Sequence, residues 1–286
     1  MADLHRLLEE QNFANAEDAE KFMTELMMKS GGRVPIQPAR APIDEAQSIM
    51  YDAWEAEGPQ RIKLARKALE VSPDCADAYV LLAEEAAGSL QEARVLYAEG
   101  VAAGKRALGE RTFKEAVGMF WGILETRPYM RALAGLADCL WELGQREEAV
   151  VHYQELLRLN PNDNQGIRDL LINCLLELNR DEEAGKLLKR YARDGMATWL
   201  YSWALWEFRQ GGDSAKARKR LKAALAQNPH VPDFLLGRKR LPRYLPEYYG
   251  FGDENEAVIY ATYNIVNWRR TPGAVEWLAG AGLPKL

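Results

Sequence analysis

Apolar and small residues recur in this chain with a period of 34 residues, and this repeat constrains the fold more than any other feature. One copy begins at Met130, and another begins at Thr198, two periods later. The copies share apolar or small residues at equivalent points and a closing proline: Leu136, Ala137, Leu140, Ala149, Tyr153 and Pro161, then Ala204, Leu205, Phe208, Ala217, Leu221 and Pro229. A period of this length accommodates two short helices and a turn, so the sequence predicts stacked helical hairpins.

This pattern resembles the tetratricopeptide-repeat (TPR) family. The resemblance implies an all-α fold, a right-handed superhelical solenoid of TPR-like helical hairpins with capping helices. It also implies a non-catalytic scaffold that binds a protein or peptide in its concave groove.

The helical periodicity predicts five hairpins and one extra helix. The hairpins pair residues 44–56 with 59–71, 75–87 with 90–108, 131–143 with 146–159, 164–178 with 181–193, and 197–209 with 214–227. The extra helix is predicted over residues 113–126, inside an irregular insertion at about 100–129, where glycines interrupt the repeat.

The predicted domain organisation follows from these boundaries. Residues 1–30 form an N-terminal helical cap or arm, with a cap favoured because a Met, Phe and Leu stripe usually belongs to a core. Residues 31–42 hold three prolines and read as a linker. The TPR-like repeats occupy 43–231, and a C-terminal helical cap occupies 232–286, with Asp253 capping a helix that begins at Glu254.

Composition narrows the function classes. The net charge is −5, which does not indicate a generally nucleic-acid-binding surface. No apolar stretch is long enough to span a bilayer, and we expect a cytoplasmic protein. The three cysteines, Cys75, Cys139 and Cys174, are too few for a disulfide framework. Packing explains them better than a zinc site with His152, because the usual ligand spacings are missing.

The end of the chain carries a second set of landmarks. They are Asn228-Pro229-His230, Leu245-Pro246-Glu247-Tyr248-Tyr249, Gly252-Asp253-Glu254-Asn255-Glu256-Ala257, Tyr260-Ala261 and Asn267-Trp268-Arg269. About 50 residues here resemble the C-terminal end of the suppression-of-tumorigenicity-seven family, whose members also carry TPR-like repeats. Those relatives are described as membrane-associated, but we do not extend that attribute to a chain without a predicted spanning segment. The resemblance transfers no catalytic residues.

The TPR resemblance also implies which side chains line the groove, since the first helix of each repeat supplies them. The protein-binding groove is predicted to include Arg131, Asp138, Trp141, Glu142, Asp169, Asn173, Trp199, Trp206 and Arg209. Binding a ligand's terminal carboxylate would require basic side chains at these groove positions, but several of them are acidic. A partner with basic and apolar features therefore fits better.

Tryptophans at helical spacing leave two interpretations open. Trp199, Trp203 and Trp206 form one stripe, which is usual for a core, and we assign Trp203 to it. Trp199 and Trp206 fall on groove positions, where aromatic side chains are frequent binding hot spots.

A basic stretch supports an alternative function. Residues 213–245 contain nine Lys or Arg against two acids. The candidate basic patch is Lys216, Arg218, Lys219, Arg220, Arg238, Lys239, Arg240 and Arg243. Such a patch indicates a nucleic-acid-associated repeat protein, although a solvated helix face is the commoner outcome. A third alternative is a permanent subunit of a larger assembly.

Nothing in the sequence indicates an enzyme. The phosphate-binding, dinucleotide-binding, metalloprotease and esterase motifs are absent from the chain. Adjacent acids such as Glu84-Glu85 point in different directions on a helix. We therefore predict no catalytic residue, no cofactor and no metal.

Overall fold

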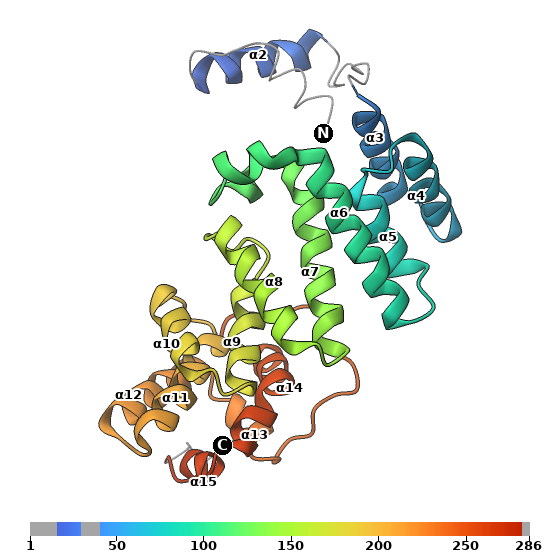
Figure 1. The fold of residues 1–286 in the computed structure, drawn as a ribbon. Coiled ribbons are helices and arrows are strands. Elements are labelled where there is room, and N and C mark those ends of the chain that lie inside the picture. The colour runs from blue at the N-terminus through green and yellow to red at the C-terminus, as the bar shows by residue number, and fades with distance from the viewer. Residues whose placement is uncertain (1–15, 30–40, 282–286) are drawn as a thin grey trace. The chain divides into compact units, whose positions relative to one another are not determined.

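The structure is a computed structural model that describes residues 16–29 and 41–281 (Figure 1). The described residues are helical, with turns and loops between helices, and contain no β-strand. This confirms the all-α fold class. The chain divides into two compact units, residues 1–139 and 140–286, and the division falls within one helix, α7 (Arg127–Glu142).

The first unit contains two antiparallel hairpins. Helices α3 (Pro42–Glu55) and α4 (Pro59–Val71) form one, and α5 (Ala76–Glu85) and α6 (Leu90–Glu115) form the other. The turn between α3 and α4 uses Gly58 at a φ of +55°, and Pro59 then opens α4, where its missing N–H costs nothing. Their shared core is rich in alanine, which lets the helix backbones approach closely; it includes Ala46, Met50, Ala53, Ala65, Ala68, Ala78 and Leu81.

The predicted helix over residues 113–126 is wrong. Helix α6 runs on to Glu115 with a break at Gly109, and two short 3₁₀ turns follow, Phe120–Gly122 and Leu124–Thr126. The buried Thr126 hydroxyl donates to the carbonyl oxygens of Phe120 and Ile123, which fixes the irregular path. Compact aromatic packing, rather than helical periodicity, sets the local structure here, as Phe113 and Tyr129 meet edge to face.

Helix α2 (Ala16–Lys29) precedes these hairpins in the chain. The predicted linker over residues 31–42 lies almost wholly outside the described residues. The predicted domain boundaries, including a cap formed by residues 1–30, stay predictions.

The second unit continues the hairpins. It holds α8 (Arg146–Leu159), α9 (Ile167–Glu177), α10 (Asp181–Arg190), α11 (Ala197–Gly211) and α12 (Ala215–Gln227). The apolar landmarks of the repeat lie in the core as expected, with Ala149, Tyr153, Ala204, Leu205, Ala217 and Leu221 all buried. Three shorter or later helices follow: α13 (Val231–Leu235), α14 (Glu254–Arg270) and α15 (Ala274–Ala279).

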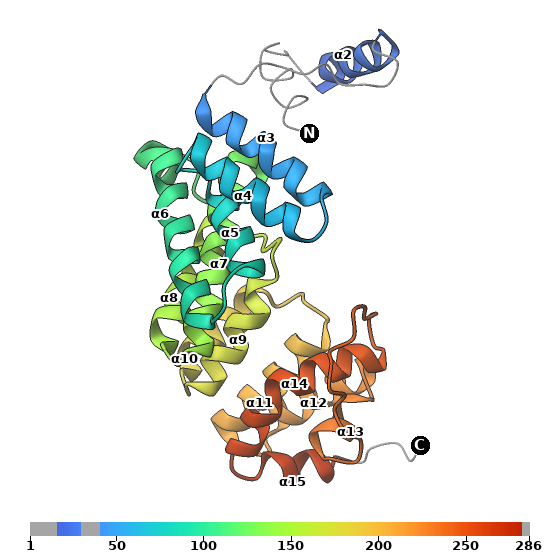
Figure 2. The ribbon, with the colours of Figure 1, turned by 90° about the vertical axis from the view of Figure 1, so that its right-hand side faces the viewer.

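Helix α14 packs against α9, α11, α13 and α15, and Figure 2 shows it running beside α11. Asp253 caps it as predicted, because its carboxylate accepts from the backbone N–H of Glu256 at 2.8 Å. The segment between α13 and α14 has no helix or strand. The sequence predicts helix α14 as part of a C-terminal cap, but it does not indicate which helices α14 packs against.

Candidate functional site: two sets of first helices

In the first unit, three alternate helices, α3, α5 and α7, bring polar and aromatic side chains together around a buried carboxylate. Asp77 of α5 is fully buried and accepts two hydrogen bonds from Arg131 of α7, at 2.8 and 2.6 Å. Gln47 of α3 donates to the same carboxylate at 2.9 Å. Three donors satisfy this buried charge, which would otherwise be costly.

An aromatic pair lies next to that carboxylate and reaches the surface. The Arg131 guanidinium lies 5.4 Å from the centre of the Trp54 ring, and Trp54 meets Tyr51 edge to face at 5.4 Å. Trp54 is 38% exposed, and the Arg131 side chain is 34% exposed. Gln47, Tyr51, Trp54 and Arg131 are called the Trp54 surface below.

The electrostatics of this surface are set mainly by burial. Burial raises the pKa of the Tyr51 phenol, with a further contribution from the Asp77 carboxylate. Burial also raises the pKa of Glu84 on α5, and the neighbouring Glu85 adds to the effect. The tyrosine is therefore a neutral hydroxyl at ordinary pH.

In the second unit, the predicted groove residues meet the protein's own helix α14. Asn267 of α14 donates to the backbone carbonyl of Asn173 at 3.4 Å. Arg209 of α11 donates to the Thr271 hydroxyl at 2.9 Å, just after α14 ends. Arg270 of α14 pairs with Glu177 of α9 at 3.4 Å. Helix α14 thus occupies the face of α9 and α11 that the repeat pattern predicts to bind a partner.

Three of the predicted groove residues make internal contacts, and full burial contradicts the predicted place of Trp199 on a partner surface. Trp199 is 0% exposed and packs edge to face against Tyr191. Trp206 donates its indole N–H to the Asp181 carbonyl at 2.7 Å. The Arg209 side chain is almost buried and also donates to the Leu176 carbonyl at 2.8 Å. All three residues contact the preceding hairpin, α9 and α10 with the residue that follows it, and Arg209 also contacts Thr271 at the end of α14.

The remaining predicted groove residues are placed as follows. Asp138 and Glu142 are exposed on α7, and Trp141 is partly buried beneath the Arg146 guanidinium, 4.9 Å from its ring centre. Asp169 and Asn173 of α9 are partly buried, and each has a side-chain oxygen that is buried without a donor among the described residues.

Asp169 has the most perturbed carboxyl group of the second unit's groove positions. Burial raises its pKa to about 7 against the attraction of Arg168, and the carboxylates of Asp194, Asp163 and Glu256 raise it further. A neutral carboxyl group relieves the cost of burying a charge beside α14.

The N-terminal end of α14 is anchored by a buried carboxylate that sequence reasoning treated only as a helix-end charge. Glu256 accepts from the backbone N–H of Ala197 and of Gly252, each at 2.8 Å. It also accepts from Asn228 at 2.9 Å and Gln227 at 3.1 Å. The four donors come from three separate parts of the unit, so nothing local in the sequence indicated them.

The predicted basic patch comes from two different elements. On α12, Arg218 forms an ion pair with Asp213, and Arg220 lies over the Trp203 ring. Lys216 and Lys219 are exposed on the same helix. After α13, Arg238 pairs with Asp233 at 3.6 Å and Lys239 with Glu254 at 3.0 Å. Arg240 and Arg243 are exposed, and Arg243 lies over the Tyr244 ring.

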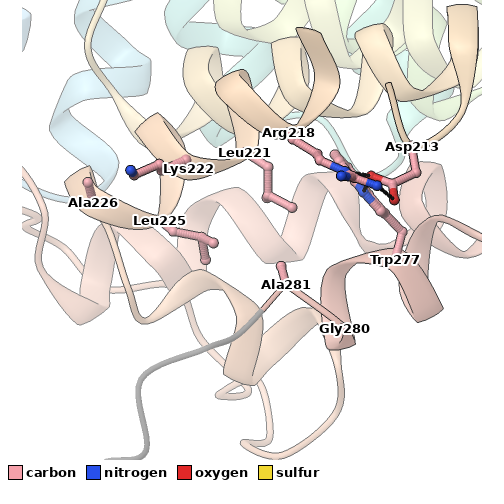
Figure 3. Close-up of a pocket in the computed structure, with 9 residues that line it drawn as sticks. All are labelled: Asp213, Arg218, Leu221, Lys222, Leu225, Ala226, Trp277, Gly280 and Ala281. Atoms are coloured by element: carbon pink, nitrogen blue, oxygen red, sulfur yellow. Dashed lines mark hydrogen bonds and ion pairs between the residues drawn. The ribbon is translucent and has the colours of Figure 1, made fainter. Parts of the chain in front are cut away.

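An open cavity of about 890 Å³ lies between α12 and α15 (Figure 3). Leu221 and Leu225 point toward the chain at Gly280 and Ala281. At one end Asp213 accepts from Arg218 at 2.6 Å and from the Trp277 indole at 2.7 Å. These bonds lower the pKa of Asp213, with Arg218 the larger cause. Asp213 and Arg218 are paired with each other, so the rest of the cavity lining is mainly apolar.

Three further observations concern the described part of the chain. The three cysteines are buried and form no disulfide, in agreement with their predicted packing role. Residues 16–29 and 41–281 contain no group of three His, Cys, Asp or Glu arranged to hold a metal ion. In the same residues, every helix is too short or too polar to cross a bilayer.

Comparison with known proteins gives one family. The family model described as "ST7 protein" matches residues 40–281. "Suppressor of tumorigenicity 7 protein-like" from Danio rerio is 32% identical over 251 residues, covering 81% of this chain and 43% of that protein. "Protein ST7 homolog" from Drosophila melanogaster is 30% identical over 258 residues, covering 82% and 48%.

The match corrects the predicted extent of the similarity, which is not confined to about 50 C-terminal residues. The chain spans about half the length of the curated relatives it matches. Among solved structures, YrrB, "a TPR protein with an unusual peptide-binding site", is 18% identical with a TM-score of 0.45, covering 65% of this chain and 84% of that chain.

Proposed function

This chain belongs to the ST7 protein family, and we propose that it is a non-catalytic interaction module whose Trp54 surface binds a peptide segment of another protein. The observation that supports this most is the convergence of first helices α3, α5 and α7 on a satisfied buried carboxylate, with the exposed Trp54 and the partly exposed Tyr51 beside it. Preorganised aromatic side chains next to an arginine are typical of binding hot spots.

The chemistry of the Trp54 surface favours a ligand with basic and apolar side chains. The exposed part of the Trp54 ring and the partly exposed Tyr51 ring can accept apolar groups and cations alike. The Arg131 charge is already compensated by Asp77, so it does not repel a basic ligand strongly. Glu84 of α5, which interacts electrostatically with Arg131, adds negative charge close to this surface.

The proposal of a non-catalytic role rests on what the Trp54 surface offers. It presents an amide, a phenol of raised pKa, an indole and a guanidinium engaged by Asp77. No nucleophile next to a base is among these four side chains, and such a pair is what covalent catalysis requires.

Selection from a displayed random peptide library, on the full chain, tests the proposal. We expect enriched peptides to carry a basic residue near an apolar one, and to lose at least tenfold in affinity for Trp54→Ala, because hot-spot aromatics dominate binding. Val95→Ala, an exposed position on α6, is the control and should leave affinity unchanged. Peptides that bind both variants equally would remove the Trp54 surface from the function.

A second candidate function is that of a permanent subunit in a larger assembly. Exposed apolar side chains outside the Trp54 surface support it, such as Met119 and Val151. Sedimentation of the isolated chain distinguishes the two: a monodisperse, stable monomer argues against a permanent subunit, because obligate subunits expose large apolar areas when separated.

We also propose the cytoplasm as the compartment, supported by the three buried cysteines, which form no disulfide, since extracytoplasmic proteins usually oxidise theirs. Fractionation of cells that express the tagged full-length protein tests this, and recovery outside the cytoplasmic fraction would contradict it.

A further inference from the structure

The connection between α13 and α14 exposes an unusual set of side chains. Large apolar side chains are exposed in close succession, namely Tyr244, Leu245, Tyr248, Tyr249 and Phe251. Tyr248 is 81% exposed and Tyr244 is 74% exposed. Residues 238–251 are called the aromatic segment below. A soluble surface rarely leaves so many rings uncovered without a binding role.

The backbone of the aromatic segment is fixed at both ends, although its rings face solvent. At its start, the N–H groups of Arg238 and Lys239 donate to the Asp233 carbonyl at 2.8 and 2.9 Å. At its end, the Tyr248 carbonyl accepts from the Asn255 amide at 2.8 Å. The backbone that carries the rings is therefore anchored at both ends, which lowers the entropic cost of ordering the segment on binding.

Positive charge is concentrated just before the rings. Four bases lie within residues 238–243, in a chain whose net charge is −5. Arg238 and Lys239 have carboxylate partners, whereas Arg240 and Arg243 form no ion pair with the described residues. Glu247 is the one acid inside the segment. The local excess of positive charge indicates an anionic ligand.

We propose that the aromatic segment binds single-stranded nucleic acid. Single-strand binding combines cations that follow the phosphate backbone with exposed aromatic rings on which bases stack. Arg240 and Arg243 supply the first feature, and Tyr244, Tyr248, Tyr249 and Phe251 supply the second. Duplexes bind more weakly, because their bases are already stacked and cannot reach the rings.

This site is separate from the proposed peptide function, because the Trp54 surface belongs to the first unit and the aromatic segment to the second. The sequence indicates the basic residues of the site, but the exposure of the four aromatic rings is visible only in the structure. Membership of the family does not itself indicate nucleic-acid binding.

Fluorescence anisotropy of a short labelled oligouridylate, titrated with the full chain at low salt, tests the proposal. We expect binding, and a loss of roughly 5- to 150-fold for Tyr248→Ala, which removes one base-stacking ring. Tyr248→Phe keeps the ring and should bind like the parent. Tyr263→Ala, at an exposed tyrosine of α14, is the matched control and should change nothing.

The salt dependence provides a second readout. Replacing Arg240 and Arg243 together by Ala should reduce the slope of log affinity against log salt concentration by roughly 1.4, about 0.7 for each lost phosphate contact. Both variants alter only exposed side chains, so circular dichroism should be unchanged.

Several results would overturn the proposal. One is no oligouridylate binding at low salt, and another is equal affinity for a duplex of the same length. Equal losses for Tyr248→Ala and Tyr263→Ala would also overturn it. If the parent chain does not bind oligouridylate but self-associates or binds vesicles, and Tyr248→Ala abolishes that association, the rings bind another ligand. Trp54→Ala should leave oligouridylate binding intact, so this test can fail without deciding the peptide proposal.

Discussion

The Arg131 guanidinium binds both oxygens of the buried Asp77 carboxylate, at 2.8 and 2.6 Å, across 54 residues of sequence. This contact joins α7 to α5, and Gln47 extends it to α3. A bidentate pair of this kind fixes geometry as well as charge, because the planar fork matches the carboxylate in one orientation. Stability and the shape of the Trp54 surface therefore depend on the same two side chains.

Arg131→Ala should destabilise the protein by roughly 3–5 kcal/mol, because it leaves the Asp77 carboxylate buried with one donor. Urea denaturation followed by circular dichroism measures the loss. Adding Asp77→Asn to Arg131→Ala should recover part of it, since an amide is cheaper to bury than an unpaired charge. Equal stability of the single variant and the parent would show that the pair contributes no net stabilisation.

Glu256→Ala should release the N-terminal end of α14 from the second unit. The change removes the acceptor for four donors, two of which are the backbone N–H groups of Ala197 and Gly252. Since buried donors without acceptors cost about 1–3 kcal/mol each, we expect a loss of several kcal/mol.

Hydrogen exchange measured by mass spectrometry locates the effect of Glu256→Ala. Amides of α14 should lose protection more than those of α8 do. Glu254→Ala, two residues earlier on α14 and exposed, is the control. Uniform loss of protection over the second unit would show that α14 is part of its global core rather than a docked helix.

Much of the fold could be predicted from the sequence, because the repeat is a local signal. Small residues such as Ala149 and Ala217 recur where helices touch, and both are fully buried. The caps and turns were equally local, as Pro59 and Asp253 illustrate. The region around Thr126 was mispredicted because its path depends on aromatic packing and a buried hydroxyl bond, which leave no periodic signal.

The candidate site was less predictable, because which face is open depends on tertiary contacts. Arg131 was predicted as a groove residue, but its partner Asp77 lies 54 positions away and was not singled out. Trp199 and Arg209 occupy groove positions of the repeat and are covered by the protein's own side chains. A sequence pattern gives the orientation of a residue on its helix, but not what packs over it.

Gly185→Ala should destabilise the contact between α10 and α11. A methyl group at this position would lie 2.5 Å from a ring carbon of Trp206, whose indole N–H is held by the Asp181 carbonyl. Displacing the indole costs about 1–3 kcal/mol, as overpacking usually does. Thermal unfolding measures it, with Gly122→Ala as the control, because a methyl group there meets no atom within 4 Å. A parent-like melting temperature would mean that the helices separate without cost.

The raised pKa of Asp169 predicts that stability falls as pH rises. The unfolded carboxyl group releases its proton near pH 3.8, whereas the folded one holds it to about pH 7. Between these values the folded state binds more protons, so its stability decreases with increasing pH and levels off above 7. The total loss is at most roughly 4 kcal/mol, since one pKa unit corresponds to about 1.4 kcal/mol. Asp169→Asn should be more stable than the parent at pH 8 and match it near pH 4. Urea denaturation across this range measures both, and parallel pH profiles would show that Asp169 is ionised in the folded protein throughout.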